Sequence, residues 1–227
     1  MRRPHSQKDN LERINIANSK HTRLTDQRIC AALEPYGVAL TEAQIESVRR
    51  YLSILMLWNQ KINLTALTDP QEILGRHFGE SLFALRAVPI SAGRLADVGS
   101  GAGFPGLALK AIRPELEVIL IEPNYKKTKF LAEVSRALGV GVEIERRRFK
   151  ELAAARAFDF IAARALGDTH SLLKWSLGTL KERGLVVLWL GSQDAEHLLA
   201  DPGWVWRKPI SIPQSHRRIL LVGKPSA

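Results

Sequence analysis

The 227-residue chain contains a single cysteine, Cys30, and no apolar stretch long enough to cross a membrane. One thiol excludes a disulfide framework within the chain and is typical of proteins from a reducing compartment. We therefore predict a cytoplasmic protein with no membrane partner and no metal site. Cys30 itself is expected to be buried in a helix, far from any catalytic position.

Acidic residues are scarcer than basic ones. The chain has 33 Lys and Arg residues against 23 Asp and Glu residues, which gives a formal net charge of +10. This excess attracts a polyanion such as RNA, although charge alone identifies no substrate. Hydrophobic residues make up 45% of the chain, enough for a sizeable core, and the length suits one α/β domain with a small helical attachment.

Composition and periodicity divide the chain into three parts. Residues 1–21 are polar and basic and read as a flexible tail, either a solvated extension or an arm that grips RNA. Residues 22–91 show helical periodicity, with a capping box at Thr41 and Gln44. Residues 92–227 alternate short β-runs with helical segments, which predicts a Rossmann-like α/β core.

That core is expected to be a mainly parallel sheet with helices on both faces, preceded by the small helical region. The expected strands cover 95–98, 118–121, 142–145, 158–162 and 185–190, and the expected helices cover 106–112, 126–138 and 169–180. Trp204–Trp206 and the segment 218–222 are expected to add a closing pair of strands, which could pair with each other in antiparallel orientation.

A glycine-rich loop follows the first expected strand. Residues 97–106 read D-V-G-S-G-A-G-F-P-G, with four glycines in eight positions before a helix begins. Glycine tolerates positive φ and lets a ligand approach the backbone closely. Glu122 follows the second strand, where an acceptor for ribose hydroxyls lies in nucleotide-binding α/β units. The two features together predict a cofactor that contains adenosine.

Two such cofactors compete for this loop. Gly101, Gly103 and Gly106 satisfy the G-x-G-x-x-G spacing of dinucleotide-binding folds. However, the carboxylate of Asp97 would repel a pyrophosphate at the helix N-terminus. S-adenosylmethionine has no phosphate and carries a sulfonium cation and an amino group, so a carboxylate favours it. An NAD(P)-binding oxidoreductase and an RNA-binding module with a vestigial pocket remain as alternatives.

The cofactor crevice should lie at the carboxyl ends of the strands. The glycine loop would wrap the methionine part, Glu122 would bind the ribose, and Phe149 and Lys150 would contact the adenine. Arg164, at the end of the fourth strand, could bind the methionine carboxylate or the substrate. A structural salt bridge to a helix carboxylate is the lower-ranked role for it. The predicted cofactor residues are Asp97, Gly99, Gly101, Gly103, Phe104, Glu122, Phe149, Lys150 and Arg164.

The loop resembles that of the glucose-inhibited division protein B family, the bacterial small-subunit rRNA methyltransferases G. Members of that family methylate nitrogen 7 of a guanine in 16S rRNA. The resemblance covers about residues 40–222. Three further segments match in order: Trp58-Asn59 with Asn63-Leu64-Thr65; Arg76-His77-Phe78 with Glu80-Ser81-Leu82; and Ala163-Arg164-Ala165.

This resemblance implies an S-adenosylmethionine-dependent enzyme whose partner is 16S rRNA or the 30S subunit; we expect it to act as a monomer. It also marks Arg164, Arg76 and His77 as catalytic. By pattern alone, His77 lies on an apolar helical stripe and reads as a satisfied, half-buried histidine. Arg76 points to a neighbouring face and is freer to meet phosphate or cofactor.

The chain lacks two features of other nucleic-acid methyltransferases. The fourth strand is followed by no Asn/Asp-Pro-Pro-aromatic turn, and no nucleophilic cysteine lies near it. Guanine nitrogen 7 needs neither, because it presents a lone pair and carries no proton, so catalysis reduces to positioning. Basic residues are then expected to grip phosphates, and the predicted RNA contacts are Arg147, Arg207, Arg217 and Arg218.

One position departs from the family pattern. Members usually show a lysine-glycine pair just after the fifth strand, whereas this chain has Leu190 before Gly191. Arg217 or Arg218 could supply the missing charge. The departure puts RNA contact in doubt more than cofactor binding.

Overall fold

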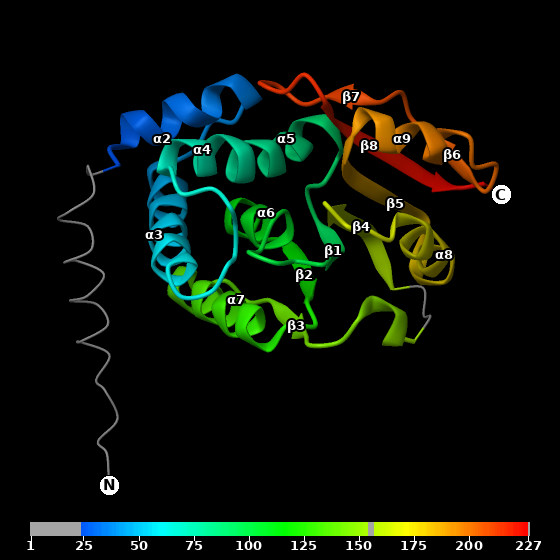
Figure 1. Cartoon of the computed structure of the whole chain (residues 1–227), viewed down its shortest axis with the longest axis horizontal. Coiled ribbons are helices and arrows are strands. Elements are labelled where there is room, and N and C mark those ends of the chain that lie inside the picture. Colours follow the sequence, from blue (N-terminus) through cyan, green and yellow to red (C-terminus); the bar gives the residue numbers. More distant parts are fainter. Residues whose placement is uncertain (1–23, 154–156, 227) are drawn as a thin grey trace, which may run out of the picture.

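The computed structural model describes residues 24–153 and 157–226, and it has a central sheet with helices on both faces (Figure 1). The tail predicted over residues 1–21 lies outside the described residues. Within these two ranges, no helix combines the length and apolar character needed to cross a bilayer.

A helical region precedes the sheet, as predicted. Thr41 caps the long helix of this region: its side chain accepts a hydrogen bond from the Gln44 amide at 3.3 Å, and Gln44 Oε1 accepts from the Thr41 amide at 2.9 Å. Both halves of the predicted capping box are therefore present. The elements are α2 (Asp26–Leu33), η1 (Glu34–Tyr36), α3 (Glu42–Asn59), α4 (Pro70–Ile73), the π-helical segment η2 (Leu74–Gly79) and α5 (Glu80–Ala87).

The sheet has the order β3-β2-β1-β4-β5-β8-β6, with β7 paired to β8. Pairing is parallel from β3 through β5 and antiparallel where β8 joins β5, β6 and β7. The mainly parallel sheet and the antiparallel closing strands are thus confirmed. The strands are β1 (Gly93–Val98), β2 (Leu116–Ile121), β3 (Glu143–Glu145), β4 (Phe158–Arg164), β5 (Leu180–Gly191), β6 (Trp204–Trp206), β7 (Ile210–Ser211) and β8 (Arg218–Pro225).

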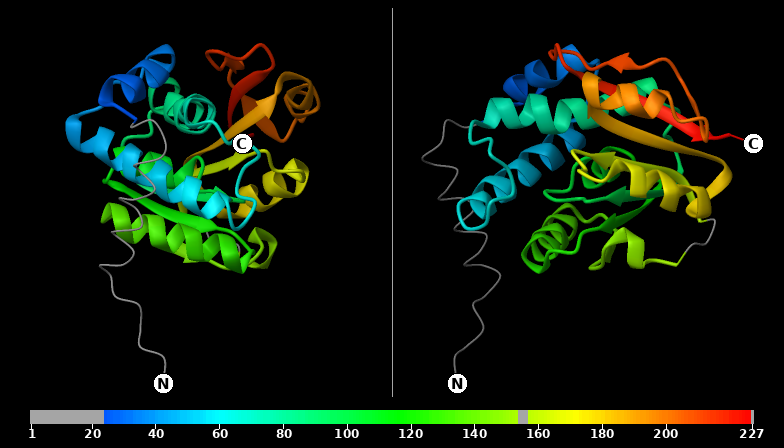
Figure 2. Two further views of the ribbon diagram at one scale, coloured as in Figure 1. Left: turned by 60° about the vertical axis from the view of Figure 1, so that its left-hand side comes forward. Right: turned by 45° about the vertical axis from the view of Figure 1, so that its right-hand side comes forward.

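Successive residues of the strands pack in two separate hydrophobic clusters, one on each face of the sheet. Leu95 packs in the cluster shared with the helical region, whereas its neighbour Ala96 packs in the cluster on the other face. Figure 2 shows these layers from two further directions. The first face is covered by α6 (Gly106–Ile112), α7 (Tyr125–Leu138) and the N-terminal helices; the second by η3 (Phe149–Glu151), α8 (Thr169–Thr179) and α9 (Ser192–Leu199).

Four details differ from the sequence-based expectation. Helix α9 and the two-residue strand β7 were not predicted, and β5 begins at Leu180 rather than at residue 185. Cys30 lies in α2 as expected, but it is exposed and not buried. Its neighbour Ile29 takes the buried position on that helix, so the cysteine side chain points to solvent.

Candidate cofactor and substrate site

The site is built at the carboxyl ends of β1, β2 and β4. Strand β1 pairs with β2 on one side and with β4 on the other, so the strand order reverses direction at β1. Open α/β sheets bind their ligands at such a switch point, outside the carboxyl ends of the strands. The glycine loop, Glu122 and Arg164 follow or end these three strands and therefore share one edge of the sheet.

The glycine loop has the left-handed backbone that its sequence predicts. Gly99 and Gly101 have φ angles of +74° and +54°, in a region that residues with a side chain rarely adopt. The Gly99 amide donates to the carbonyl of Ile121 at 2.9 Å, which ties the loop to the end of β2. A Cβ at Gly101 would have no non-neighbouring heavy atom closer than 3.7 Å, so space for a ligand adjoins this glycine.

Glu122 joins the glycine loop to the following helix. Its Oε2 accepts from the Gly101 amide at 2.9 Å, and its Oε1 accepts from the Asn124 amide at 2.9 Å. The residue is only 5% exposed. A carboxylate oxygen accepts more than one hydrogen bond, so both oxygens keep capacity for ribose hydroxyls while they hold the loop.

Asp97 is buried beneath the loop, at the end of β1. Its Oδ2 accepts from the Gly106 amide at 3.0 Å, whereas Oδ1 is buried without a hydrogen-bond partner. Burial raises the pKa of this carboxyl to about 7, against the lowering effect of the Gly106 hydrogen bond. The sequence placed Asp97 beside the cofactor, and the structure gives it in addition the role of an N-terminal anchor for α6.

Phe104 and His77 bring the glycine loop against the N-terminal helices. The His77 ring stacks on Phe104 with centroids 4.9 Å apart, and Tyr51 stacks on Phe104 at 5.3 Å. The Tyr51 hydroxyl donates to the Ala102 carbonyl at 2.6 Å, which ties the glycine loop to α3. The Arg-His segment and the glycine loop, far apart in sequence, are therefore in contact.

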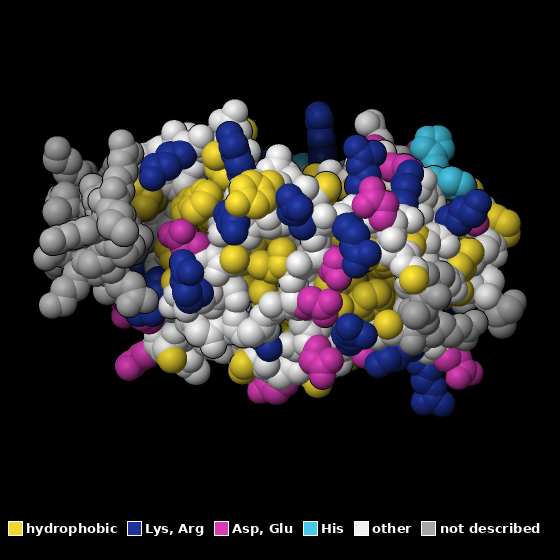
Figure 3. Space-filling model, turned by 90° about the horizontal axis from the view of Figure 1, so that it is seen from below, with side chains coloured by type: hydrophobic (Ala, Val, Ile, Leu, Met, Phe, Trp, Pro, Cys, Tyr) yellow, Lys and Arg dark blue, Asp and Glu magenta, His cyan; other side chains and the backbone are white. Residues whose placement is uncertain are grey.

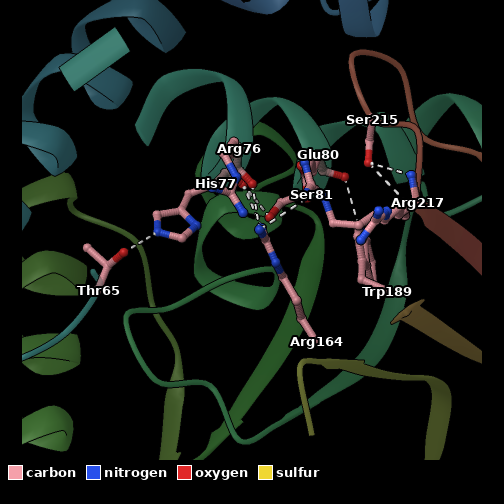
Figure 4. Close-up of polar contacts among 10 residues, drawn as sticks. Thr65, Arg76, His77, Glu80, Ser81, Arg164, Trp189, Ser215 and Arg217 are labelled. Carbon is pink, nitrogen blue, oxygen red and sulfur yellow. Dashed lines mark hydrogen bonds and ion pairs between the residues drawn. The ribbon is translucent and has the colours of Figure 1, made fainter. Parts of the chain in front are cut away.

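His77 is held in its neutral form. Burial, followed by the positive charges of Arg164 and Arg76, lowers its pKa to about 3. Its Nε2 lies 2.7 Å from Thr65 Oγ1, while Nδ1 is buried with no hydrogen-bond partner (Figure 4). The pattern-based expectation of a half-buried histidine is confirmed, except that one of its two nitrogens is unsatisfied.

Arg164 reaches from β4 to the segment that contains Arg76 and His77. Its Nη2 donates to the Arg76 carbonyl at 2.6 Å, and its Nη1 lies 3.5 Å from the His77 carbonyl (Figure 4). The same Nη2 lies 3.1 Å from Oε2 of Glu80, which is 0% exposed. The ion pair with a helix carboxylate, ranked lower from the sequence, is thus present in the structure.

A second arginine shares this buried carboxylate. Arg218 donates from Nε to Glu80 Oε1 at 2.8 Å, and its Nη2 lies 2.7 Å from the same oxygen. Trp189 Nε1 donates to the backbone carbonyl of Glu80 at 2.7 Å. Glu80 therefore joins the helical region to β4, β5 and β8.

The remaining predicted residues are more dispersed. Phe149 is buried against Trp175, with ring centroids 5.7 Å apart, and Lys150 forms an ion pair of 2.6 Å with Asp168. Arg76 is exposed, as expected. Of the predicted RNA contacts, Arg207 and Arg217 are exposed, Arg147 pairs with Glu145 at 3.0 Å, and Arg218 is committed to Glu80.

Glu80 is the functional candidate that the sequence reading left without a role. It lies seven residues after Ile73 and three after His77, so it falls on the same helical stripe as these buried residues. A carboxylate on an apolar stripe needs a cationic partner, and this signal was available from the spacing alone. Tyr51 was missed because its partner, the Ala102 carbonyl, is distant in sequence and leaves no local pattern.

Comparison with known proteins agrees with this architecture. A relative from Sorangium cellulosum, a "Ribosomal RNA small subunit methyltransferase G", is 40% identical over 76% of this chain and 74% of its own. One from Xylella fastidiosa with the same description is 35% identical over 86% and 95%. The ribosomal protein L11 methylase of Lactobacillus delbrueckii subsp. bulgaricus shares the fold, with a TM-score of 0.56 and 17% identity over 67% of this chain and 80% of its own.

The family model GidB, rRNA small subunit methyltransferase G, matches residues 44–206, a range that takes in the glycine loop and Arg164. The segments that meet at the edge of the sheet are thus the ones that carried the resemblance, and the chain belongs to the GidB family of rRNA small subunit methyltransferases G.

Proposed function

We propose that this protein uses S-adenosylmethionine to methylate nitrogen 7 of a guanine in 16S rRNA. One observation carries the proposal. The His77 ring stacks on Phe104 of the glycine loop, and Arg164 contacts the His77 and Arg76 carbonyls. A loop suited to the methyl donor and the residues that the family resemblance marks as catalytic therefore adjoin one another.

The residues at the loop fit S-adenosylmethionine better than a dinucleotide. The carboxylate of Glu122 gives the edge a negative character, and Oδ1 of Asp97 is a buried acceptor without a partner. Both features suit a cationic ligand and oppose a pyrophosphate. We assign the methionine end to residues 97–104, the ribose to Glu122 and the adenine side to Phe149 and Lys150. When bound, the cofactor supplies an electrophilic methyl group on its sulfonium.

The chain's contribution to the reaction is then positioning and charge control. Guanine nitrogen 7 carries no proton, so the site needs no general base. Methylation leaves a positive charge on the purine, which a neighbouring cation would disfavour. His77 is neutral because of its lowered pKa, and Arg164 is paired with Glu80, a carboxylate that it shares with Arg218. Orienting the base in line with the methyl group can contribute roughly 7–11 kcal/mol to lowering the barrier.

The substrate is proposed to be the 30S subunit or its 16S rRNA, which places the activity in the cytoplasm. Arg147, Arg207, Arg217 and Arg218 are the proposed phosphate contacts. Arg218 pairs in register with Gly191 of β5, next to Leu190. Its guanidinium, however, is paired with Glu80, whereas Arg217 next to it is exposed. This favours Arg217 over Arg218 as the replacement for the lysine of family members.

We further propose a monomer organised as a basic tail (1–21), a helical region (22–91) and a methyltransferase core (92–227). Size-exclusion chromatography with light scattering tests the monomer, and limited proteolysis tests the boundaries. A dimer mass would contradict the first, and cleavage away from the junctions would contradict the second.

The function is tested by incubating the protein with labelled S-adenosylmethionine and 30S subunits that lack the modification. We expect label in 16S rRNA, and tighter equilibrium binding of S-adenosylmethionine than of NADH or NADPH. Preferential binding of a nicotinamide cofactor would support an oxidoreductase. RNA binding without label transfer would support a vestigial pocket.

A further inference from the structure

An exposed tyrosine begins α7, just beyond the proposed ribose site. Tyr125 is 55% exposed, and among the described residues with an exposed large hydrophobic side chain it is the only aromatic one. It lies three residues after Glu122, whose Oε1 accepts from the intervening Asn124 amide at 2.9 Å. The tyrosine is thus anchored next to the glycine loop, with its ring open to solvent.

Cations surround this ring. Lys129 Nζ lies 5.2 Å and Arg146 Cζ 5.5 Å from its centroid, so both lie within cation–π range. Figure 3 looks onto the side of the molecule where α7 lies in Figure 1, and it shows Lys and Arg side chains interspersed with hydrophobic and acidic ones on that face. Beside Tyr125 is a hollow of about 360 Å³, and none of its lining residues is acidic: Lys61, Ile62, Asn63, Asn124, Lys126 and Lys127.

The position of these lysines is unfavourable for the isolated protein. Lys126, Lys127 and Lys129 lie in the first two turns of α7, and its first turn contains no acidic residue. The N-terminus of a helix carries partial positive charge, so cations there destabilise the helix. A bound polyanion would offset the repulsion between these lysines and the helix N-terminus. A helix face that only contacts solvent would gain nothing from lysines at these positions.

We propose that Tyr125 is a stacking platform for an unpaired base of the RNA substrate, and that the hollow beside it holds the adjoining phosphates. This inference rests on the proposed function. Unpaired bases stack on exposed aromatic rings, and lysines neutralise the backbone that connects them. An RNA strand bound at the start of α7 would lie next to the proposed ribose site. This surface would therefore bind the nucleotides that flank the target guanine.

The test compares Tyr125→Ala with Tyr125→Phe, and Leu177→Ala serves as a control at another exposed apolar residue. We expect Tyr125→Ala to weaken binding of transcribed 16S rRNA by about 5- to 100-fold, the range for loss of one base–aromatic stack. Tyr125→Phe and Leu177→Ala should bind as the wild type does. All three should bind S-adenosylmethionine normally in calorimetry.

The hollow is tested with Lys61→Ala, Lys126→Ala and Lys127→Ala combined. The slope of log affinity against log salt should become shallower by about 2, since each single-strand phosphate contact contributes roughly 0.7. Wild-type RNA binding by Tyr125→Ala, or an unchanged slope in the triple variant, would overturn the inference. Loss of S-adenosylmethionine binding in Tyr125→Ala would assign the ring to the adenine instead.

Failure of the inference is distinguishable from failure of the proposed function. If the wild type methylates 30S subunits while the Tyr125 and lysine variants bind rRNA unchanged, only the platform is wrong. If the wild type neither binds rRNA nor transfers methyl groups, the proposed function fails and the platform falls with it.

Discussion

At the residue scale, Arg164 combines a structural contact with a proposed substrate role. Arg164→Ala removes one of the two cationic partners of the buried Glu80. Because Arg218 remains, the loss of stability should be smaller than the roughly 3–5 kcal/mol expected when a buried charge is left without a partner. Lysine cannot reproduce the planar contacts to Glu80 and two carbonyls, so Arg164→Lys should also melt at a lower temperature. We expect both variants to lose most methyl transfer even at temperatures where they are folded. Near-normal turnover there would show that the role of Arg164 is structural alone.

Loss of the Glu122 side chain is expected to weaken binding of the cofactor and not of the RNA. Glu122→Ala removes the acceptor of the Gly101 amide together with the proposed ribose acceptor. Binding of S-adenosylmethionine should weaken by about 1.5–3 kcal/mol for each charged hydrogen bond lost, as measured by calorimetry. Binding of 16S rRNA should be nearly unchanged, and a variant that loses RNA but keeps the cofactor would place Glu122 outside the ribose site.

His77 should remain neutral across the physiological range. Because its pKa falls to about 3 in the folded protein, the unfolded chain takes up a proton below about pH 6.5 that the folded chain does not. This histidine therefore costs stability as the pH falls from about 6.5 toward 3. Asp97, with a raised pKa of about 7, acts in the opposite direction over much of this range, so melting curves mix the two effects.

Nuclear magnetic resonance of the imidazole separates the protonation of His77 from that of Asp97. The His77 Cε1–H signal, assigned with His77→Gln, should keep the shift of a neutral ring from pH 8 to pH 5. A titration midpoint near 6.5 would contradict the buried, cation-flanked environment described above.

At the element scale, the glycine loop offers a matched comparison. Gly101 and Gly139 both have positive φ, +54° and +67°, and neither has a non-neighbouring heavy atom within 3.4 Å of an added Cβ. Valine at either position therefore introduces similar backbone strain. Gly101→Val should abolish binding of S-adenosylmethionine, while Gly139→Val, at the end of α7, should only lower the melting temperature. Normal cofactor affinity in Gly101→Val would mean that the loop does not contact the ligand.

Strong local signals made several elements predictable. Helix α6 was predicted with its observed bounds, Gly106–Ile112, because the glycine loop and Pro105 mark its start. The segment Ser192–Leu199 was missed because five of its eight residues are polar or charged and only Ala195 is buried. The early start of β5 depends on Leu180 pairing with Phe158 of β4, a tertiary contact that leaves no local pattern.

Part of the site was also predictable from local sequence signals. Motif residues such as Gly101 and Glu122 lie where the sequence placed them, because strand ends of a parallel sheet share one edge. The partners of Arg164 could not be read from the sequence. They lie 84 to 88 positions away on η2 and α5, and only the packing of the helical region against the sheet brings them together.

At the scale of the whole molecule, the N-terminal helical region and the sheet are joined by an ion-pair cluster and a shared hydrophobic core. The buried carboxylate of Glu80 pairs with Arg164 on β4 and Arg218 on β8, and the hydrophobic core beneath it includes residues from both the N-terminal helices and the sheet. The helical region thus forms one wall of the proposed methylation site.

The central claim is tested most directly by identifying the nucleoside that receives the methyl group. Unmodified 30S subunits are incubated with labelled S-adenosylmethionine and the protein, and the 16S rRNA is digested and analysed by mass spectrometry. The account predicts label in 7-methylguanosine at a single position, and no label with Gly101→Val. Label in any other methylated nucleoside, or no label with protein that binds both the cofactor and the subunit, would contradict it.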